Sequence, residues 1–304
     1  MKVSVITPFY NGNAYMERYQ RMMEANLRAM PEGHSLEVIL VNDSPETAVS
    51  LSGIFRGQSQ VRVLTHEKNM GIHAARLTGL AAADGDYVIF LDQDDLLADD
   101  AIAQLLTEAE RIAKADGSRR CCRVIVSNAY LEQGDGSKQL WYRNEAHKKL
   151  IGNLHTYVTV GTQIISPGQC LLNRELIPQA WREHVCRKNG ADDYYLWLLL
   201  LQSGVSFSLY DFPLYTHCHT PENVSADTTV TDTSSMEFLS YLREDPDFPK
   251  ETADRLEEML TYKAEFRTSG LAGRIGLSLS HFRIFAANVS FKIKTGTYYG
   301  FNRS

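Results

Sequence analysis

The stretch EKNMGIHAARLTGLAAADGDYVIFLDQDD, residues 67–95, decides the fold. After the turn signal near its start, a segment rich in Ala and Leu predicts a helix over residues 71–83. A short apolar run over residues 87–91 predicts a buried strand, and the acidic segment Asp92-Gln93-Asp94-Asp95 follows that strand directly. A helix that leads into a buried strand ending in acids indicates an α/β protein whose ligands bind at the strand ends.

The segments on either side repeat this alternation of strand and helix. Upstream, strands are expected over residues 3–9, 36–41 and 61–64, with a helix over 14–30. Because strands separated by helices form βαβ units, the pattern predicts a parallel sheet with right-handed crossovers. Downstream, the chain is expected to form a helix over 99–113, a hairpin over 123–131 and 138–143, helices over 173–180 and 192–203, a strand over 205–210, and helices over 236–242 and 251–267.

Polar residues follow the predicted strands at one edge of the sheet. Thr7-Pro8-Phe9-Tyr10 ends the first strand, Asn42-Asp43-Ser44 ends the second, and Asn69 follows the third. Arg76 lies in the helix that comes next. Since the carboxyl ends of parallel strands meet at the same edge, these residues imply a single site.

The acidic segment after the fourth strand has two interpretations. Three carboxylates within four residues repel one another, and Mg²⁺ or Mn²⁺ takes one or two carboxylates together with substrate phosphates. Alternatively, Asp95 or Asp99 caps the N-terminus of the helix expected over 99–113. The position after a buried strand, beside the other polar strand ends, favours the metal site.

The composition is that of a globular protein. The 304 residues are enough for one large α/β domain, alone or with a helical appendage. A net charge of −6 gives no overall signal for nucleic acid binding. Five cysteines without a CxxC pair fit a reducing compartment, and the N-terminus lacks a signal-peptide pattern. The longest apolar run, residues 194–201, is too short to cross a bilayer, so we expect a cytoplasmic protein.

The C-terminal stretch carries the opposite charge to the rest of the chain. From Thr261 onwards there are seven Lys or Arg and one acid, which makes this tail +6 and the remainder −12. Residues 271–291 alternate small, apolar and basic residues, a composition that suits the inner face of a membrane with anionic lipid. An ordinary helix packed on the catalytic domain explains the stretch equally well. Peripheral membrane contact and homo-oligomerisation are therefore both expectations for this region.

Four segments together resemble the signature of family 2 glycosyltransferases. They are VITPFYNG (5–12), VNDS (41–44), the opening stretch 67–95, and GADDYYLWLLL (190–200), and the resemblance covers about residues 2–225. Members of this family are inverting enzymes with the GT-A fold, a Rossmann-like mixed and mainly parallel sheet flanked by helices. The resemblance implies a catalytic domain over 1–230, with a nucleotide-binding half (1–115) and an acceptor half (116–230), and a C-terminal helical extension over 231–304.

Matching positions imply the residues that bind the nucleotide-sugar donor. Thr7, Pro8 and Tyr10 would line the nucleoside pocket. Asp43 matches an acid that hydrogen-bonds a pyrimidine base, and Asn42 replaces the first of the two acids that the family usually has here. The uracil and thymine bases present the same imide N–H, so the resemblance implies a UDP- or dTDP-linked sugar.

The next two segments match the part of the family's site that holds the diphosphate. Asn69 and Arg76 would lie near the ribose and diphosphate, where a guanidinium suits phosphate oxygens. Asp92 would hold the ribose or a metal-bound water, Asp94 would coordinate Mn²⁺ or Mg²⁺, and Asp95 would support it. A histidine near the end of the resemblance can approach the metal or the diphosphate, and His219 is preferred here over His217.

The pair Asp192-Asp193 resembles the family's acidic motif ahead of an aromatic residue. Inverting transfer needs one base to take the proton of the acceptor hydroxyl. Asp193 is the expected base, and Asp192 its helper or a contact to the acceptor. The same acids would also cap the helix that follows them, and the two roles are compatible.

The resemblance predicts a metal-dependent transferase that moves a sugar from a nucleotide diphosphate to a glycan or a lipid-linked sugar in surface polysaccharide biosynthesis. One alternative is a sugar-nucleotide nucleotidyltransferase, which needs a Gly-rich phosphate loop after the first strand; VITPFYNGNAYMER has none. The other is a non-catalytic glycan-binding relative, against which the retained acidic motifs argue. The sequence does not specify the sugar or the acceptor.

Overall fold

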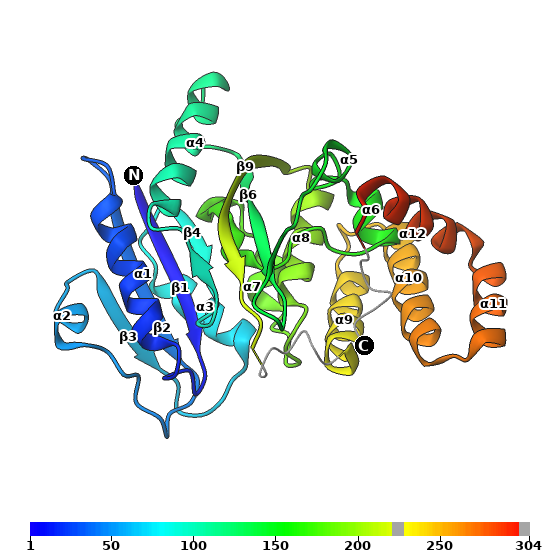
Figure 1. Cartoon of the computed structure of the whole chain (residues 1–304), viewed down its shortest axis with the longest axis horizontal. Helices are drawn as coiled ribbons and strands as arrows, with labels where there is room; N and C mark the ends of the chain where they lie inside the picture. Colours follow the sequence, from blue (N-terminus) through cyan, green and yellow to red (C-terminus); the bar gives the residue numbers. More distant parts are fainter. Residues whose placement is uncertain (221–227, 298–304) are drawn as a thin grey trace. The chain divides into compact units, whose positions relative to one another are not determined.

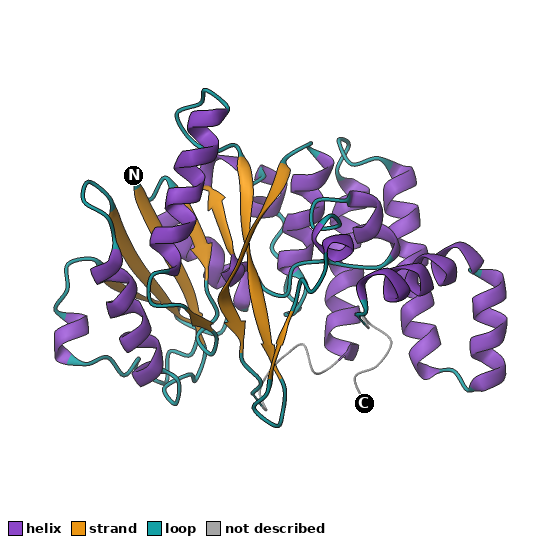
Figure 2. Ribbon diagram, turned by 45° about the horizontal axis from the view of Figure 1, so that its top comes forward, coloured by secondary structure: helices purple, strands orange, loops and turns teal. Residues whose placement is uncertain are grey.

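The structure is a computed structural model of the chain, and it describes residues 1–220 and 228–297. Its strands are β1 (Lys2–Phe9), β2 (Ser35–Asn42), β3 (Val61–Thr65), β4 (Tyr87–Phe90), β5 (Leu96–Leu97), β6 (Arg123–Glu132), β7 (Lys138–Leu140), β8 (Cys170–Asn173) and β9 (Ser206–His217). They form one mixed sheet in the order β3-β2-β1-β4-β8-β6-β9-β5, with β7 paired to β6 (Figures 1 and 2).

Helices connect the strands and make up the C-terminal part of the chain. They are α1 (Met16–Ala29), α2 (Gly53–Arg56), α3 (Ile72–Ala82), α4 (Ala101–Ala115), α5 (Glu145–Lys148), α6 (Leu154–Thr159), α7 (Gln179–Glu183), α8 (Asp192–Gln202), α9 (Thr228–Glu244), α10 (Lys250–Thr268), α11 (Leu271–Ser280) and α12 (Phe282–Thr295). Two short 3-10 helices, η1 (Pro167–Gln169) and η2 (Arg174–Leu176), flank β8.

The chain forms two compact units. Unit 1 comprises residues 1–141, 164–177 and 205–221, and it contains the whole sheet. Unit 2 comprises residues 142–163, 178–204 and 222–304, and its described elements are helices, α5 to α12. The chain therefore passes between the units repeatedly, whereas the sequence suggested one boundary near residue 230.

The core of unit 1 explains why its first strands are continuous apolar runs. β1 pairs in parallel with β2 and β4, and β2 pairs in parallel with β3. Val3, Val5 and Ile6 of β1 are completely buried, and so are Val38 and Ile39 of β2. Parallel strands of this kind are covered on both faces, so their apolar residues do not alternate with polar ones.

Close packing of α3 against β1 depends on a glycine. A Cβ atom added to Gly79 would lie 2.3 Å from Cγ2 of Ile6 and 3.3 Å from Cγ2 of Val41. No side chain fits in that space without displacing the strand residues. The glycine thus brings the helix close to the sheet, directly before β4 and its acidic segment.

The α/β class, the strands expected over 3–9, 36–41, 61–64 and 87–91, and the hairpin of β6 and β7 are all confirmed. The helix expected over 173–180 is wrong. Asn173 ends β8, which runs antiparallel between β4 and β6, and only a 3-10 turn follows before Pro178. Proline fixes its own backbone and disfavours helix in the preceding residue, which interrupts the apparent helical pattern.

Candidate donor site at the strand ends

The first three strands of unit 1 end side by side. Phe9 of β1 is paired with Asn42 of β2, and Asn42 is paired with Thr65 of β3. β4 ends three residues earlier along β1, since its last residue, Phe90, is paired with Ile6. The polar segments that follow these strands therefore share one edge of the sheet, as the alternation in the sequence predicted.

Gln93 joins the loop after β1 to the loop after β4. Its Oε1 accepts a hydrogen bond from the backbone N–H of Tyr10 at 3.0 Å, and its Nε2 donates to the carbonyl oxygen of Tyr10 at 3.0 Å. A Cβ atom added to Gly12 would lie 2.0 Å from Gln93 Oε1, so the amide lies directly over that glycine. The paired hydrogen bonds hold the two loops in register.

Asp43 fixes the turn that precedes α3. Its carboxylate accepts hydrogen bonds from the backbone N–H groups of Met70 (2.7 Å) and Gly71 (2.8 Å), and it lies 2.7 Å from Nδ1 of His66. Gly71 has φ of 90°, a conformation that glycine adopts without strain. A carboxylate offers about four lone-pair positions, so Asp43 keeps room for about one more donor.

Arg76 and Asp92 form a buried ion pair. Nη2 of Arg76 lies 2.7 Å from Oδ1 of Asp92, and the arginine side chain is almost completely buried. The hydroxyl of Ser166 donates to Oδ2 of Asp92 at 3.3 Å. Both oxygens of Asp92 thus have partners. The guanidinium of Arg76, which was expected near the diphosphate, neutralises the negative charge of Asp92.

Of the three acids, Asp94 has the fewest neighbouring groups that stabilise its negative charge. Its carboxylate accepts one long hydrogen bond, from the hydroxyl of Thr220 at 3.3 Å, and no basic side chain of the described residues pairs with it. Burial, together with the charges of Asp95 and Asp92, raises the pKa of Asp94 to about 7. Arg18 binds the backbone carbonyl of Asp94 instead of its carboxylate.

Asp95 is buried in unit 1, where it ties this loop to the end of β9. Its carboxylate accepts hydrogen bonds from the hydroxyl of Tyr215 and from the backbone N–H of Cys218, the latter at 2.9 Å. Nδ1 of His217 lies 3.2 Å from Oδ1 of Asp95. Burial alone would lower the pKa of His217, but the charge and hydrogen bond of Asp95 outweigh it and raise the pKa.

The two histidines considered for the metal have different surroundings. His217 lies against Asp95, whereas His219 is exposed, and a Cβ atom added to Gly134 of the β6–β7 turn would lie 3.5 Å from its Nε2. Among the described residues, no group of three or more His, Cys, Asp or Glu side chains is placed to hold a metal by itself. The metal role of either histidine and of Asp95 stays a prediction.

The residues expected around the nucleoside differ in their accessibility. Thr7 is fully buried and its hydroxyl lies 2.7 Å from that of Tyr19, and Pro8 is buried as well. Tyr10, in contrast, is 53% exposed and can offer its ring to a base. Asn69 is exposed, and its side-chain oxygen accepts a hydrogen bond from the N–H of Gly71.

Asp192 and Asp193 belong to unit 2, where they form the first turn of α8. Asp192 is 2% exposed, and its carbonyl accepts a hydrogen bond from the indole N–H of Trp181 at 2.8 Å. Asp193 is only partly buried, and its carboxylate accepts a hydrogen bond from the N–H of Tyr194 at 2.7 Å. Of the two acids, Asp193 is the one that solvent or a substrate can reach.

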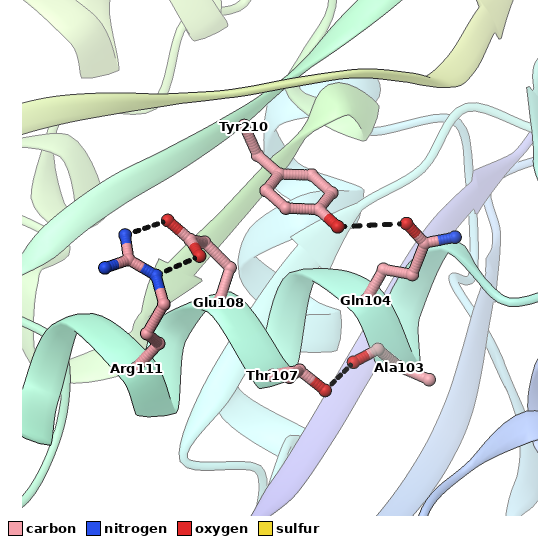
Figure 3. Close-up of a pocket in the computed structure, with 6 residues that line it drawn as sticks. All are labelled: Ala103, Gln104, Thr107, Glu108, Arg111 and Tyr210. Atoms are coloured by element: carbon pink, nitrogen blue, oxygen red, sulfur yellow. Dashed lines mark hydrogen bonds and ion pairs between the residues drawn. The ribbon is translucent and has the colours of Figure 1, made fainter.

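A cavity of about 230 Å³ lies elsewhere in unit 1, between α4 and Tyr210 of β9 (Figure 3). Its side chains satisfy one another: Arg111 pairs with Glu108, and the Tyr210 hydroxyl donates to Gln104 at 3.1 Å. None of the acids at the strand ends lines this cavity, so it is not the candidate site.

Gln93 and Arg18 were not predicted from the sequence to belong to the site. Gln93 lies within the acidic segment, but its amide carries no charge, and Arg18 is distant in the sequence from the acids. Ser166 and Tyr215 lie in segments that match the family, but their contacts with Asp92 and Asp95 arise only through the fold. The antiparallel pairing of β5 with β9, which brings Leu96 opposite Thr216, placed Tyr215 there.

Residues 4–177 match the model of the family described as glycosyl transferase family 2. The chain belongs to this family. Curated relatives include the uncharacterized glycosyltransferase EpsJ of Bacillus subtilis (33% identical over 36% of this chain and 30% of EpsJ). Another is the poly(ribitol-phosphate) beta-N-acetylglucosaminyltransferase TarP of Staphylococcus aureus (34% identical over 34% of this chain and 32% of TarP). The matched segments thus span about a third of these relatives' length.

Solved structures of S. aureus TarS have a similar fold. TarS 1-349 in complex with UDP is 17% identical, covers 100% of this chain and 94% of that chain, and has a TM-score of 0.60. TarS 1-349 in complex with UDP-GlcNAc is 19% identical, covers 97% and 82%, and has a TM-score of 0.59. At this identity the similarity establishes the GT-A fold alone, and the expected fold is confirmed.

Proposed function

We propose that the chain transfers a sugar from a nucleotide-diphosphate sugar to a hydroxyl of a glycan or a lipid-linked sugar, with inversion at the anomeric carbon. The observation that carries the proposal is the environment of Asp94. This carboxylate is largely buried beside two other acids, and no basic side chain of the described residues pairs with it. A donor that arrives with a divalent cation would supply the missing positive charge.

The fit to Mn²⁺ or Mg²⁺ follows from the donor set. These cations prefer oxygen ligands and are held in such sites by one or two carboxylates together with phosphate oxygens and water. Asp94 would be the main ligand, and Asp92, whose oxygens already contact Arg76 and Ser166, would hold the ribose or a metal-bound water. When bound, the cation would neutralise the charge that develops on the leaving diphosphate. Asp95 would contribute by fixing the loop, because its oxygens are taken by Tyr215 and Cys218.

The favoured nucleotide is UDP. Tyr10 offers an exposed ring, and Asp43 keeps room for one further donor, such as the imide N–H of uracil. TarS, which has a similar fold, is described in complex with UDP and with UDP-GlcNAc. The name of TarP, a poly(ribitol-phosphate) beta-N-acetylglucosaminyltransferase, supports a polymer as the acceptor.

The transfer requires a base for the acceptor hydroxyl. As the acceptor oxygen forms its bond to the anomeric carbon, the bond to the diphosphate oxygen breaks, and the hydroxyl proton passes to a carboxylate. Asp193 is the proposed base because it is the accessible acid of the pair at the N-terminus of α8. The helix N-terminus favours its ionised form, which can accept a proton.

The test uses the purified chain, Mn²⁺ and a panel of UDP-, dTDP- and GDP-linked sugars without acceptor. Slow release of one nucleoside diphosphate identifies the donor, whereas release of pyrophosphate from a nucleoside triphosphate would indicate a nucleotidyltransferase. Glycan binding with no donor turnover would indicate a non-catalytic relative. Asp193→Asn is expected to lower transfer to an acceptor by roughly 10²- to 10⁴-fold and to leave the UDP-induced thermal shift intact. Glu244→Gln, an exposed acid in unit 2, is the matched control, and full turnover by Asp193→Asn would reject the assignment of the base.

A further inference from the structure

The helices α11 and α12 expose a run of large apolar side chains, which we call the basic apolar face. It consists of Leu271, Ile275 and Leu279 of α11 and Phe282, Val289 and Ile293 of α12. Leu271, Leu279 and Ile293 are each more than 70% exposed. A single exposed apolar residue is ordinary, but six exposed large apolar residues on two successive helices indicate an interaction surface.

The orientation of α12 is fixed by its opposite side. Ile284, Asn288, Phe291 and Thr295 are buried, and the side-chain amide of Asn288 donates to the carbonyl oxygen of Thr159 in α6 at 2.9 Å. Their spacing of three and four residues is that of one helical face. Phe282, Val289 and Ile293 occupy the other face, so they are exposed because the helix is anchored with that face outward.

The outward stripe of α11 has the same regular spacing. Leu271, Ile275 and Leu279 follow one another at intervals of four residues, and all three are exposed. α11 lies beside α10, where His281 Nδ1 is 3.0 Å from Glu258 and Arg274 donates to the carbonyl oxygen of Phe266 (Figure 1). Both helices thus present an apolar stripe, α12 opposite its buried face and α11 on a helix that has no buried residue.

Positive charges border these stripes. Residues 271–297 contain four cations, Arg274, Arg283, Lys292 and Lys294, and no Asp or Glu. At about 100° per residue, Arg283 and Lys294 fall on one flank of the α12 stripe and Lys292 on the other. Long basic side chains beside an apolar stripe can extend toward anionic headgroups while the stripe enters the acyl boundary.

We propose that the basic apolar face binds the surface of an anionic phospholipid membrane, with α11 and α12 lying in the headgroup region. The positive charge of this face favours an anionic membrane over a second copy of the chain as its partner. A symmetric contact between two such faces would bring eight cations together without a carboxylate among residues 271–297 of either copy. An anionic bilayer supplies the complementary charge at the same place. No helix of the described part of the chain is long and apolar enough to cross a membrane, which is consistent with a surface contact.

The test is co-sedimentation of the 304-residue chain with vesicles, without any nucleotide sugar, so that its outcome is independent of transferase activity. The protein is expected to sediment with vesicles that contain phosphatidylglycerol, to remain free with pure phosphatidylcholine, and to dissociate as salt is raised. Arg283→Gln with Lys294→Gln should weaken binding roughly thirtyfold, from about 1 kcal/mol per cation. Phe282→Ser with Ile293→Ser should abolish it, because the apolar contact is lost.

Two controls make the result specific to this face. Phe212→Ser removes an exposed aromatic side chain from unit 1, and Lys114→Gln removes an exposed cation there. Both variants should bind the vesicles like the unchanged protein. The proposal is overturned if no vesicle is bound, or if the controls lose as much binding as the α12 variants. It is also overturned if the Phe282/Ile293 variant changes the oligomeric state in sedimentation velocity and leaves vesicle binding unchanged.

Discussion

Replacing Asp94 with Asn should stabilise the protein at alkaline pH. Folding raises the pKa of Asp94 from 3.8 to about 7, which at about 1.4 kcal/mol per pH unit corresponds to about 4 kcal/mol of lost stability. Well below pH 3.8 the carboxyl is protonated in both the folded and the unfolded state, so no stability is lost. The loss grows as the pH rises, because the unfolded chain ionises first, and it is complete above about pH 7. The variant carries no charge and avoids this cost.

The assay is the melting temperature of both proteins between pH 5 and pH 8, without metal or nucleotide. At about 2 °C per kcal/mol for a chain of this size, Asp94→Asn should melt roughly 8 °C higher at pH 8. The difference should shrink as the pH falls toward 5. Asp99→Asn, an exposed acid five positions along, should leave the melting temperature unchanged. Equal melting temperatures at pH 8 would refute the reasoning that Asp94 is an uncompensated buried charge.

Two further predictions concern packing and loop position. Gly79→Ala should lower the free energy of unfolding by about 1 to 3 kcal/mol, because its Cβ atom would lie 2.3 Å from Ile6. Gly53→Ala, whose Cβ atom would meet no neighbour, should leave the free energy of unfolding unchanged. Urea unfolding measures both variants, and equal stabilities would contradict the close packing of α3 on β1. Gln93→Ala removes both hydrogen bonds to Tyr10 and should raise KM for the donor about tenfold with little change in kcat. Steady-state kinetics with the identified donor measure this effect, and an unchanged KM would mean that the bonds do not position the loop.

The sequence predicted the nucleotide-binding half well because its signals are local. β1, β2 and β4 are short apolar runs bounded by turn residues, and each polar segment directly follows its strand. Chain order alone places such segments at one edge of a parallel sheet. For that reason the sequence alone assigns Asp43, Arg76 and Asp94 to one site.

The partners of these residues could not be predicted in the same way. Asp95 interacts with Tyr215 and Cys218, more than 100 residues along the chain, through the antiparallel pairing of β5 with β9. β5 has only two residues, too few to give a pattern. β8, with four residues, was missed for the same reason, and the Thr- and Ser-rich start of α9 resembles a loop because those residues favour turns.

The repeated passage of the chain between the two units limits how the protein can be dissected. α8 reaches the helical unit from the middle of the sequence, and its Tyr195 stacks on Phe238 of α9, with ring centroids 5.8 Å apart. A truncation at residue 230 would remove that partner and expose to water the side of α8 that packs on α9. The helical unit cannot be detached as a C-terminal module, and any exchange of parts between relatives has to move three separate segments together.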